Sequence, residues 1–338
     1  MVRYIIKRLL LSILVIFGVS ILIFTISRII PGDPARLALG PRATDEAVET
    51  LRKEMNLNEP LPKQYALWLK DVLHGNFGRS LTSKRPVSMD VKQFLPATIE
   101  LMIFAALFMV IFAFLLGILS AKYKNSVFDG LIRIFTYAGI ALPAFVVATL
   151  LLLLFGFVWE GTIPVLGRLS LGIEVPKHIT GFYVLDGLLT GKFSTAWDAF
   201  LHLLLPAIAL SLGGMVQNAR LLRSSLIDNM DKEYITVSKS FGLPANLLMR
   251  KYLLKPSSVS VITVMGMDIA SLFGNAFLVE NIFNWPGLSR YGINSMLSKD
   301  LNSIVAVILI IGVIFLIVNF AVDLIAAVLD PRIRLGGE

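Results

Sequence analysis

Two polar side chains inside an apolar stretch are the first candidates for a chemical role. Asp268 lies ten residues into the apolar stretch 258–282, and Asn275 follows it by seven residues. Seven residues make about two turns of a helix, so both side chains would lie on the same face. Ionisable and polar groups in apolar segments are costly and often mark solute pathways. The sequence therefore predicts an aqueous passage lined by Asp268 and Asn275, with a structural contact between helices as the alternative.

Residue types that commonly carry catalysis or bind metals are scarce. The chain has no Cys, and its three His residues are scattered along it: His74, His178 and His202. A cysteine-ligated metal site is therefore excluded, and a histidine metal cluster is not indicated. A membrane-embedded hydrolase would need a nucleophile and a base, or metal ligands, at one place in the bilayer. Of the hydrolase hypotheses, only an aspartyl mechanism stays open.

The stretch 187–192 comes close to a phosphate-binding loop without matching one. Its two glycines are one residue too close together, and no Ser or Thr follows Lys192 directly. No strand is predicted before it. We therefore predict no nucleotide site, so energy from ATP would have to come from another chain.

Composition indicates what surrounds the elements that position these residues. The 338 residues are 56% hydrophobic and 16% charged, with a mean hydropathy of +0.77. A soluble domain is about a quarter charged, so the expected surrounding is a bilayer. A helix must be about 20 apolar residues long to cross about 30 Å of hydrocarbon. Six stretches reach or nearly reach this length: 9–30, 99–121, 131–159, 200–222, 258–282 and 303–329.

Features within these stretches refine the expectation. The first is too long for the apolar core of a signal peptide, so we predict an uncleaved first span. Pro143 and Pro206 are expected to kink the third and fourth spans. No internal repeat or pair of broken helices is evident. A secondary transporter, which often shows both, therefore stays only as a rival hypothesis.

Six crossings place both termini on one side of the membrane, and the charge pattern indicates which side. The formal net charge is +8. Short segments on the side of the termini are rich in Lys and Arg, which is typical of cytoplasmic segments. These basic residues are Arg3, Lys7, Arg8, Lys122, Lys124, Arg133, Arg220, Arg223, Lys232, Lys239, Arg250, Lys251, Lys255, Arg332 and Arg334. We therefore predict that both termini are cytoplasmic.

The residues between the predicted spans outline the domains. Segment 31–98 has helical periodicity at 44–55, with Thr44 as a plausible N-cap, and again at 64–73. We expect it to form a small helical extracytoplasmic cap, and segment 160–199 to be a second outer elaboration. The predicted domains are 1–30 (the N-terminal tail and first span), 31–98 (the cap) and 99–338 (a core with five spans and the cytoplasmic loop 224–257).

That cytoplasmic loop contains a short helical pattern with a strong stop. The pattern begins near Glu233 and ends at Phe241, where Gly242 can adopt a left-handed conformation and Pro244 prevents continuation. A second helical piece then leads back to the membrane. Such a helix suits the transmission of force from a cytosolic partner, and an ordinary basic loop is the alternative.

The loop resembles the coupling loop of binding-protein-dependent ABC importer permeases, and the whole chain resembles the dipeptide, oligopeptide and nickel branch of that family. Matching segments follow the family's order from end to end. They are PGDPA (31–35), NLNEPL (56–61), GNFGRS (75–80), LPATIEL (95–101), ITGFY (179–183), DGLL (186–189), LPA (205–207), VENIF (279–283), WPGL (285–288) and DPR (330–332). Two features depart from the pattern. Val237 and Ser238 replace the usual alanines, and Ser260 stands where a proline is usual, with Pro256 one turn earlier.

The resemblance implies an all-α integral membrane permease with six transmembrane helices, an extracytoplasmic cap and a cytoplasmic coupling helix, in a prokaryotic inner membrane. Such a chain is not an enzyme and holds no cofactor, since ATP and Mg are bound by partner subunits. The implied partners are a homologous second permease, two nucleotide-binding ATPase subunits, an extracytoplasmic solute-binding protein and membrane lipid, but no nucleic acid. Di- or oligopeptides are the expected solutes, with oligosaccharides or nickel as alternatives.

The resemblance also assigns roles to residues. Contact with the ATPases is expected at Glu233, Tyr234, Ser238, Gly242 and Leu243. Candidates for the translocation pathway are Asp268, Asn275 and Glu280. Glu280 lies near the outer end of the fifth span, where we expect exposure to make its charge cheap.

Overall fold

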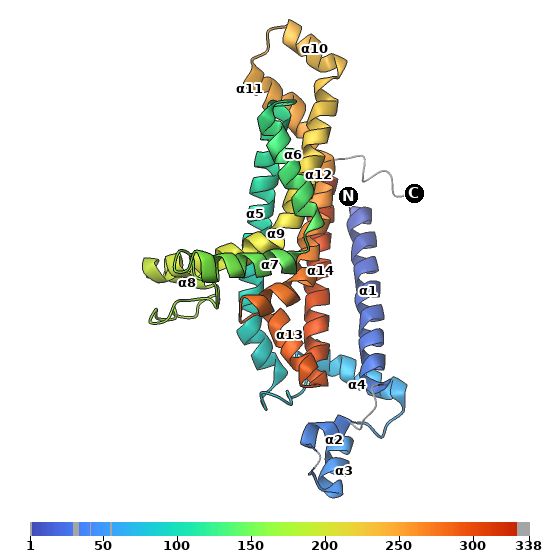
Figure 1. Cartoon of the computed structure of the whole chain (residues 1–338). Coiled ribbons are helices and arrows are strands. Elements are labelled where there is room, and N and C mark those ends of the chain that lie inside the picture. The colour runs from blue at the N-terminus through green and yellow to red at the C-terminus, as the bar shows by residue number, and fades with distance from the viewer. Residues whose placement is uncertain (1, 30–33, 41, 55, 330–338) are drawn as a thin grey trace. The chain divides into compact units, whose positions relative to one another are not determined.

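The computed structural model describes residues 2–29, 34–40, 42–54 and 56–329 (Figure 1). The segments 31–33 and 330–332 and the basic residues Arg332 and Arg334 lie outside the described residues. Within the described part, the regular structure is helical apart from one isolated bridge between Arg79 and Pro86. The helices are α1 (Val2–Ile29), α2 (Pro34–Leu39), α3 (Asp45–Glu54), α4 (Leu61–Leu73), α5 (Val87–Lys122), α6 (Val127–Ala141), α7 (Ala144–Leu153), the π-helix η1 (Leu154–Val158), α8 (Tyr183–Leu189), α9 (Phe193–Met230), α10 (Glu233–Ser240), α11 (Ala245–Leu247), the π-helix η2 (Leu248–Leu254), α12 (Lys255–Ile282), α13 (Leu288–Leu297) and α14 (Leu301–Leu329).

The expected all-helical membrane class is confirmed. In the described part of the chain, five helical stretches are long and apolar enough to cross a membrane, or six if one bent pair counts as a single span. The five are Ile5–Arg28, Val87–Lys122, Phe193–Met230, Ala245–Ile282 and Leu301–Ile325. Each contains most of a predicted span, although α5 begins at Val87, inside the segment predicted to be cap, and α9 continues well past the predicted end at 222.

The third predicted span, 131–159, is not a single kinked helix. Its two halves, Val127–Ala141 and Ala144–Val158, are bent by 107°. Pro143 is the N-cap of the second half, and the residue before it, Leu142, has an extended ψ of 117°. A proline disfavours the helical conformation of the residue before it, which ends α6 there. The break is therefore at the predicted proline, but it is much sharper than a kink.

The chain forms two compact units. The core unit comprises Met1–Ile6, Leu95–Arg290 and Phe315–Glu338, and the second unit comprises Lys7–Phe94 and Tyr291–Ile314. In the core unit, α9 packs against α6, α7, α8 and α12, and it is the most buried of the candidate spans. A helix covered by protein on most sides can carry more polar residues than one that faces lipid. This explains why the stretch Phe193–Met230 is less apolar than Ile5–Arg28, Val87–Lys122 or Leu301–Ile325.

In the second unit, aromatic rings join α1 to α4. The ring centroids of Phe24 and Tyr65 are 5.3 Å apart, and Trp68 lies 5.5 Å from Phe24. The hydroxyls of Ser20 and Tyr65 are 2.7 Å apart. The predicted cap helices are α3 and α4, and Thr44 Oγ1 accepts a 3.3 Å hydrogen bond from the backbone N–H of Ala47, as an N-cap should. The end predicted for the first of them, Met55, lies outside the described residues.

A buried carboxylate, Asp186, fixes one turn of the segment 160–199 in the core unit. Asp186 accepts hydrogen bonds from the backbone N–H groups of Ile179, Thr180 and Gly181 at 3.2, 2.8 and 2.9 Å. Burial alone would raise the pKa of Asp186, but the hydrogen bonds from Thr180 and its neighbours outweigh it and lower the pKa below its usual value. The carboxylate thus holds the loop in a fixed turn at the start of α8.

A close contact between α12 and α14 in the core unit gives a stability test. A Cβ added to Gly266 would lie 1.9 Å from Val322 Cγ1 and 2.8 Å from Val322 Cβ. Gly266→Ala should therefore destabilise the protein by about 1–3 kcal/mol, because the helices must move apart. The measurement is the apparent melting temperature of the purified complex in detergent.

The matched control for this substitution is Gly130→Ala on α6. Nothing lies within 4 Å of a Cβ added at Gly130, and alanine favours a helix over glycine by about 1 kcal/mol. Gly130→Ala should leave the melting temperature unchanged or slightly higher. Equal melting temperatures for the two variants would show that the α12–α14 contact does not limit stability.

Candidate functional site

The helix stop predicted at Gly242 is confirmed. Helix α10 ends at Ser240, and Gly242 has a φ of +73°. The N–H of Gly242 donates to the carbonyl of Lys239 at 2.9 Å, and the N–H of Leu243 donates to that of Ser238 at 3.3 Å. These two bonds are the Schellman arrangement, which satisfies the last carbonyls of the helix. Gly242 therefore fixes the angle at which the chain leaves α10.

Helix α10 presents an apolar stripe to its surroundings. Tyr234, Val237 and Phe241 are 43%, 53% and 82% exposed, and their spacing of three and four residues puts them on one face. Ile235, on another face, is fully buried and holds the helix against the protein. Apolar residues exposed together on a short helix mark an interaction surface. Sequence reasoning chose Tyr234 but missed that Val237 and Phe241 complete this stripe.

The other residues predicted for this segment take supporting positions. Glu233 is the first residue of α10, where a carboxylate is favoured by the helix dipole. Ser238 Oγ donates to the carbonyl of Tyr234 at 2.7 Å. The base of the segment is held by Asn229 at the end of α9, whose Nδ2 donates to Ser257 Oγ on α12 at 2.9 Å. Figure 1 shows α10 at the far end of α9, beyond the ends of α5 and α6.

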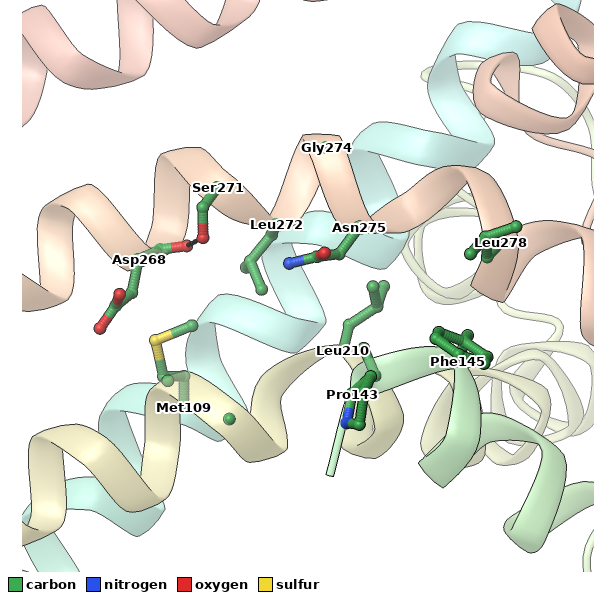
Figure 2. A pocket seen from close by; sticks show the side chains of 13 residues that line it. Met109, Pro143, Phe145, Leu210, Asp268, Ser271, Leu272, Gly274, Asn275 and Leu278 are labelled. Atoms are coloured by element: carbon green, nitrogen blue, oxygen red, sulfur yellow. Dashed lines mark hydrogen bonds between the residues drawn. The ribbon is translucent and has the colours of Figure 1, made fainter. Parts of the chain in front are cut away.

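A cavity of about 370 Å³ lies in the core unit where α9 and α12 meet the break at Pro143. Asp268 and Asn275 both line it, so the predicted common face is confirmed. Figure 2 shows these two side chains and Ser271 along one helix, with Leu210, Pro143 and Phe145 across the cavity. The cavity therefore combines a carboxylate, an amide and a hydroxyl with apolar walls.

Asp268 also has a structural partner. Asn218 Nδ2 on α9 donates to Asp268 Oδ2 at 2.5 Å and to the carbonyl of Gly214 at 2.7 Å. The sequence left open whether Asp268 lines a passage or makes a structural contact between helices. Its position is compatible with both, because one carboxylate oxygen links α12 to α9 and the residue also lines the cavity. Asn275 has an exposed side chain at the same cavity.

Glu280 is placed differently from the expectation. Its side chain is fully buried, so the prediction of an exposed charge is wrong. Thr98 Oγ1 donates to Glu280 Oε1 at 2.6 Å, and the N–H of Arg290 donates to Oε2 at 2.9 Å. A Cβ on Gly287 would lie 2.3 Å from Oε2. Glu280 does not line the 370 Å³ cavity but joins Thr98 on α5 to Gly287 and to Arg290 on α13.

Two arginines counted as loop residues lie within α9 instead. Arg223 makes a bidentate pair with the buried Asp129, at 2.8 Å from Nε and 2.7 Å from Nη2. Ser120 Oγ donates to the same carboxylate at 2.5 Å. This group joins α5, α6 and α9 at one level. Arg220, three residues earlier, has its Cζ 5.9 Å from the ring centroid of Tyr137.

Comparison with known proteins decides the family. The profile described as "Binding-protein-dependent transport system inner membrane component" matches residues 113–335, and its N-terminal companion matches residues 1–102. The chain belongs to this permease family. It follows that the chain is a multi-pass inner membrane protein of an ABC system, in which ATPase and binding-protein subunits are its partners.

Relatives match over almost the full length of the permease. It is 37% identical to the dipeptide transport system permease protein DppB of Alkalihalophilus pseudofirmus, over 99% of this chain and 100% of the relative. It is 36% identical to the probable D,D-dipeptide transport system permease protein DdpB of Escherichia coli K12, over 96% and 95%. It is 31% identical to the glutathione transport system permease protein GsiC of the same strain, over 99% of each chain.

The family also settles the questions of catalysis and cofactor. ATP hydrolysis in these systems resides in separate subunits, so the permease is not an enzyme. The family carries no cofactor. In the part of the permease that the structure describes, no group of three or more His, Asp or Glu side chains could hold a metal ion.

Proposed function

We propose that the permease imports short peptides, pairs with a homologous second permease, and is driven through α10 by two cytosolic ATPases. The single observation that carries the coupling role is the exposed apolar stripe of Tyr234, Val237 and Phe241 on a helix with a fixed exit angle. The peptide substrate rests on the names of the relatives, which include dipeptide and glutathione systems. Oligosaccharides and nickel are the alternative solutes.

The proposed orientation places both termini and α10 in the cytoplasm. The basic residues Lys239, Arg250 and Lys251 lie within the segment 233–254, and Lys232 directly precedes it, which is where the positive-inside rule expects them. The domains predicted from the sequence fit this arrangement. Residues 1–30 would start in the cytoplasm and span, 31–98 would form the extracytoplasmic cap, and 99–338 would form the core with the cytoplasmic loop 224–257.

Nucleotide binding would close the ATPase pair, and α10 would move with it. Glu233, Tyr234, Ser238, Gly242 and Leu243 are the proposed coupling residues, with Val237 and Phe241 added from the stripe. The resulting motion would open the passage lined by Asp268 and Asn275 to alternate sides of the membrane. Glu280, predicted as a pathway residue, is not part of this proposed passage, because its carboxylate is buried among Thr98, Gly287 and Arg290.

Reconstitution tests the substrate directly. The complete importer, purified with its binding protein and placed in proteoliposomes containing ATP, should accumulate labelled alanyl-alanine, and unlabelled dipeptides should compete with it. Uptake should stop when ATP is withheld, because the driving force comes from the ATPase subunits. Accumulation of nickel or of an oligosaccharide, but not of alanyl-alanine, would overturn the peptide assignment. Uptake that continues without ATP but needs an ion gradient would favour a secondary transporter.

A further inference from the structure

A second cavity, of about 650 Å³, lies along the same two helices. Tyr137, Gln217, Arg220, Ser224 and Val264 are among the residues that line it. On α9, the residues that line one or other cavity follow helical spacing from Gly213 through Gln217 and Arg220 to Ser224. On α12 they run from Val264 through Asp268 and Ser271 to Asn275. One face of each helix therefore passes from the first cavity to the second.

This shared face differs from a face that meets lipid. Along most of α1 the exposed residues are large and apolar, among them Leu10, Leu14 and Leu22. The exposed residues on the shared face include Gln217, Arg220, Ser271 and Asn275. Charged and amide side chains are expensive against hydrocarbon, whereas they suit a hydrated route. The face shared by the two cavities is therefore suited to a polar solute.

The shared face carries one charge of each sign. Asp268 lines the first cavity and Arg220 the second. Arg223, which also reaches the second cavity, is already held by Asp129. Within the described residues, no ion pair involves Arg220, whose guanidinium lies near the ring of Tyr137 instead. Arg220 is thus available to a carboxylate brought by a solute, and guanidinium groups bind carboxylates well.

The separation along α9 between the level of Asp268 and Arg220 matches the length of a short peptide. A Cβ added at Gly214 would lie 3.3 Å from Asp268 Cβ, so Gly214 marks the level of Asp268 on α9. Arg220 is six residues further along the same helix, which at 1.5 Å per residue is about 9 Å. An extended peptide spans about 3.3–3.6 Å per residue, so two or three residues cover this length.

We infer that the face shared by α9 and α12 binds the two ends of a short zwitterionic peptide, with Asp268 facing its ammonium group and Arg220 its carboxylate. The inference rests on the proposed function, since it gives the proposed peptide substrate its contacts in the passage. It adds Arg220 to the residues that determine specificity, and it predicts that solutes with only one charge are carried poorly.

The test uses reconstituted importer with labelled alanyl-alanine. Asp268→Asn and Arg220→Gln should each lower uptake at least ten-fold, while ATP hydrolysis stimulated by the loaded binding protein stays within two-fold, because α10 is untouched. Arg220→Lys, which keeps the charge, should retain most of the uptake. The matched control is Arg42→Gln, an exposed arginine between α2 and α3 that lines neither cavity, which should behave like the unmodified protein.

A merely structural role gives a different pattern. The amide of Asp268→Asn can still accept the hydrogen bond from Asn218, so a structural role predicts normal uptake for Asp268→Asn and a defect for Asn218→Ala. That pattern would overturn the inference. So would normal uptake in Arg220→Gln, or a fall in ATP hydrolysis that parallels the fall in uptake. If the unmodified importer does not move alanyl-alanine at all, the proposed function fails as well. If it does move this dipeptide and both charge variants do too, only this inference fails.

Discussion

Gly242→Asp will leave the permease inserted and folded but will lower solute uptake at least ten-fold and abolish the stimulation of ATP hydrolysis by the loaded binding protein. Gly242 has a φ of +73°, where residues with a side chain cost about 1–2 kcal/mol. Aspartate tolerates this conformation better than most residues, so the segment should keep its fold. Its negative charge, however, lies at the C-terminal end of α10 beside the exposed Phe241, on the surface proposed to contact the ATPases, where the helix dipole also disfavours it.

A second glycine in the core unit provides the matched control. Gly191, just after α8, has a φ of +71°, and nothing lies within 4 Å of a Cβ added there or at Gly242. Gly191→Asp therefore imposes the same backbone conformation and the same charge, but away from α10. It should transport normally. Unchanged substrate-stimulated ATP hydrolysis in Gly242→Asp, or an equal loss in both variants, would contradict the coupling role of this segment.

Arg168→Met will destabilise the core unit by about 3–5 kcal/mol, because it leaves a buried carboxylate without its partner. Arg168 Nη2 lies 2.5 Å from Glu100 Oε2, and the two side chains are 7% and 2% exposed. The same nitrogen donates to the carbonyl of Gly181 at 2.9 Å, and the guanidinium Cζ is 3.5 Å from the ring centroid of Tyr183. Thermal unfolding of the purified complex in detergent measures the loss.

Two further variants separate the buried charge from other causes. Lys192→Met breaks an exposed pair with Glu174 in the same segment 160–199, and it should not change the melting temperature measurably, since exposed pairs contribute little. Adding Glu100→Gln to Arg168→Met should recover part of the loss, because the uncompensated charge is removed. A double variant as unstable as Arg168→Met would place the effect in lost packing against Tyr183 instead.

The sequence was sufficient to predict features that depend on local patterns. Hydropathy and length placed five spans, and the order Phe241, Gly242, Leu243, Pro244 placed the end of α10, because a helix stop depends on the conformational freedom of the residues at it. The common face of Asp268 and Asn275 followed from helical spacing alone. The coupling and pathway roles assigned to these residues remain predictions.

The features that sequence reasoning missed depend on distant partners. Glu280 appeared exposed because the groups that bury it, Thr98 and Gly287, cannot be paired with it from spacing. Arg220 was counted as a loop charge because an arginine near the end of an apolar run usually marks the membrane boundary, whereas α9 continues to Met230. The bend of 107° at Pro143 was underestimated, since a proline indicates where a helix can break but not by how much.

The π-helix Leu248–Leu254 has a mechanical consequence. It continues directly into α12, so that 245–282 form one uninterrupted helical stretch from the base of α10 to the residues beside the cavity. Between α10 and this stretch lies the short turn 241–244, which the hydrogen bonds of Gly242 and Leu243 to the last carbonyls of α10 hold in place. A displacement of α10 would therefore reach the cavity as a rotation of one continuous helix. A π turn contains one residue more than an α turn, so it is a point at which this helix can shift its register without breaking.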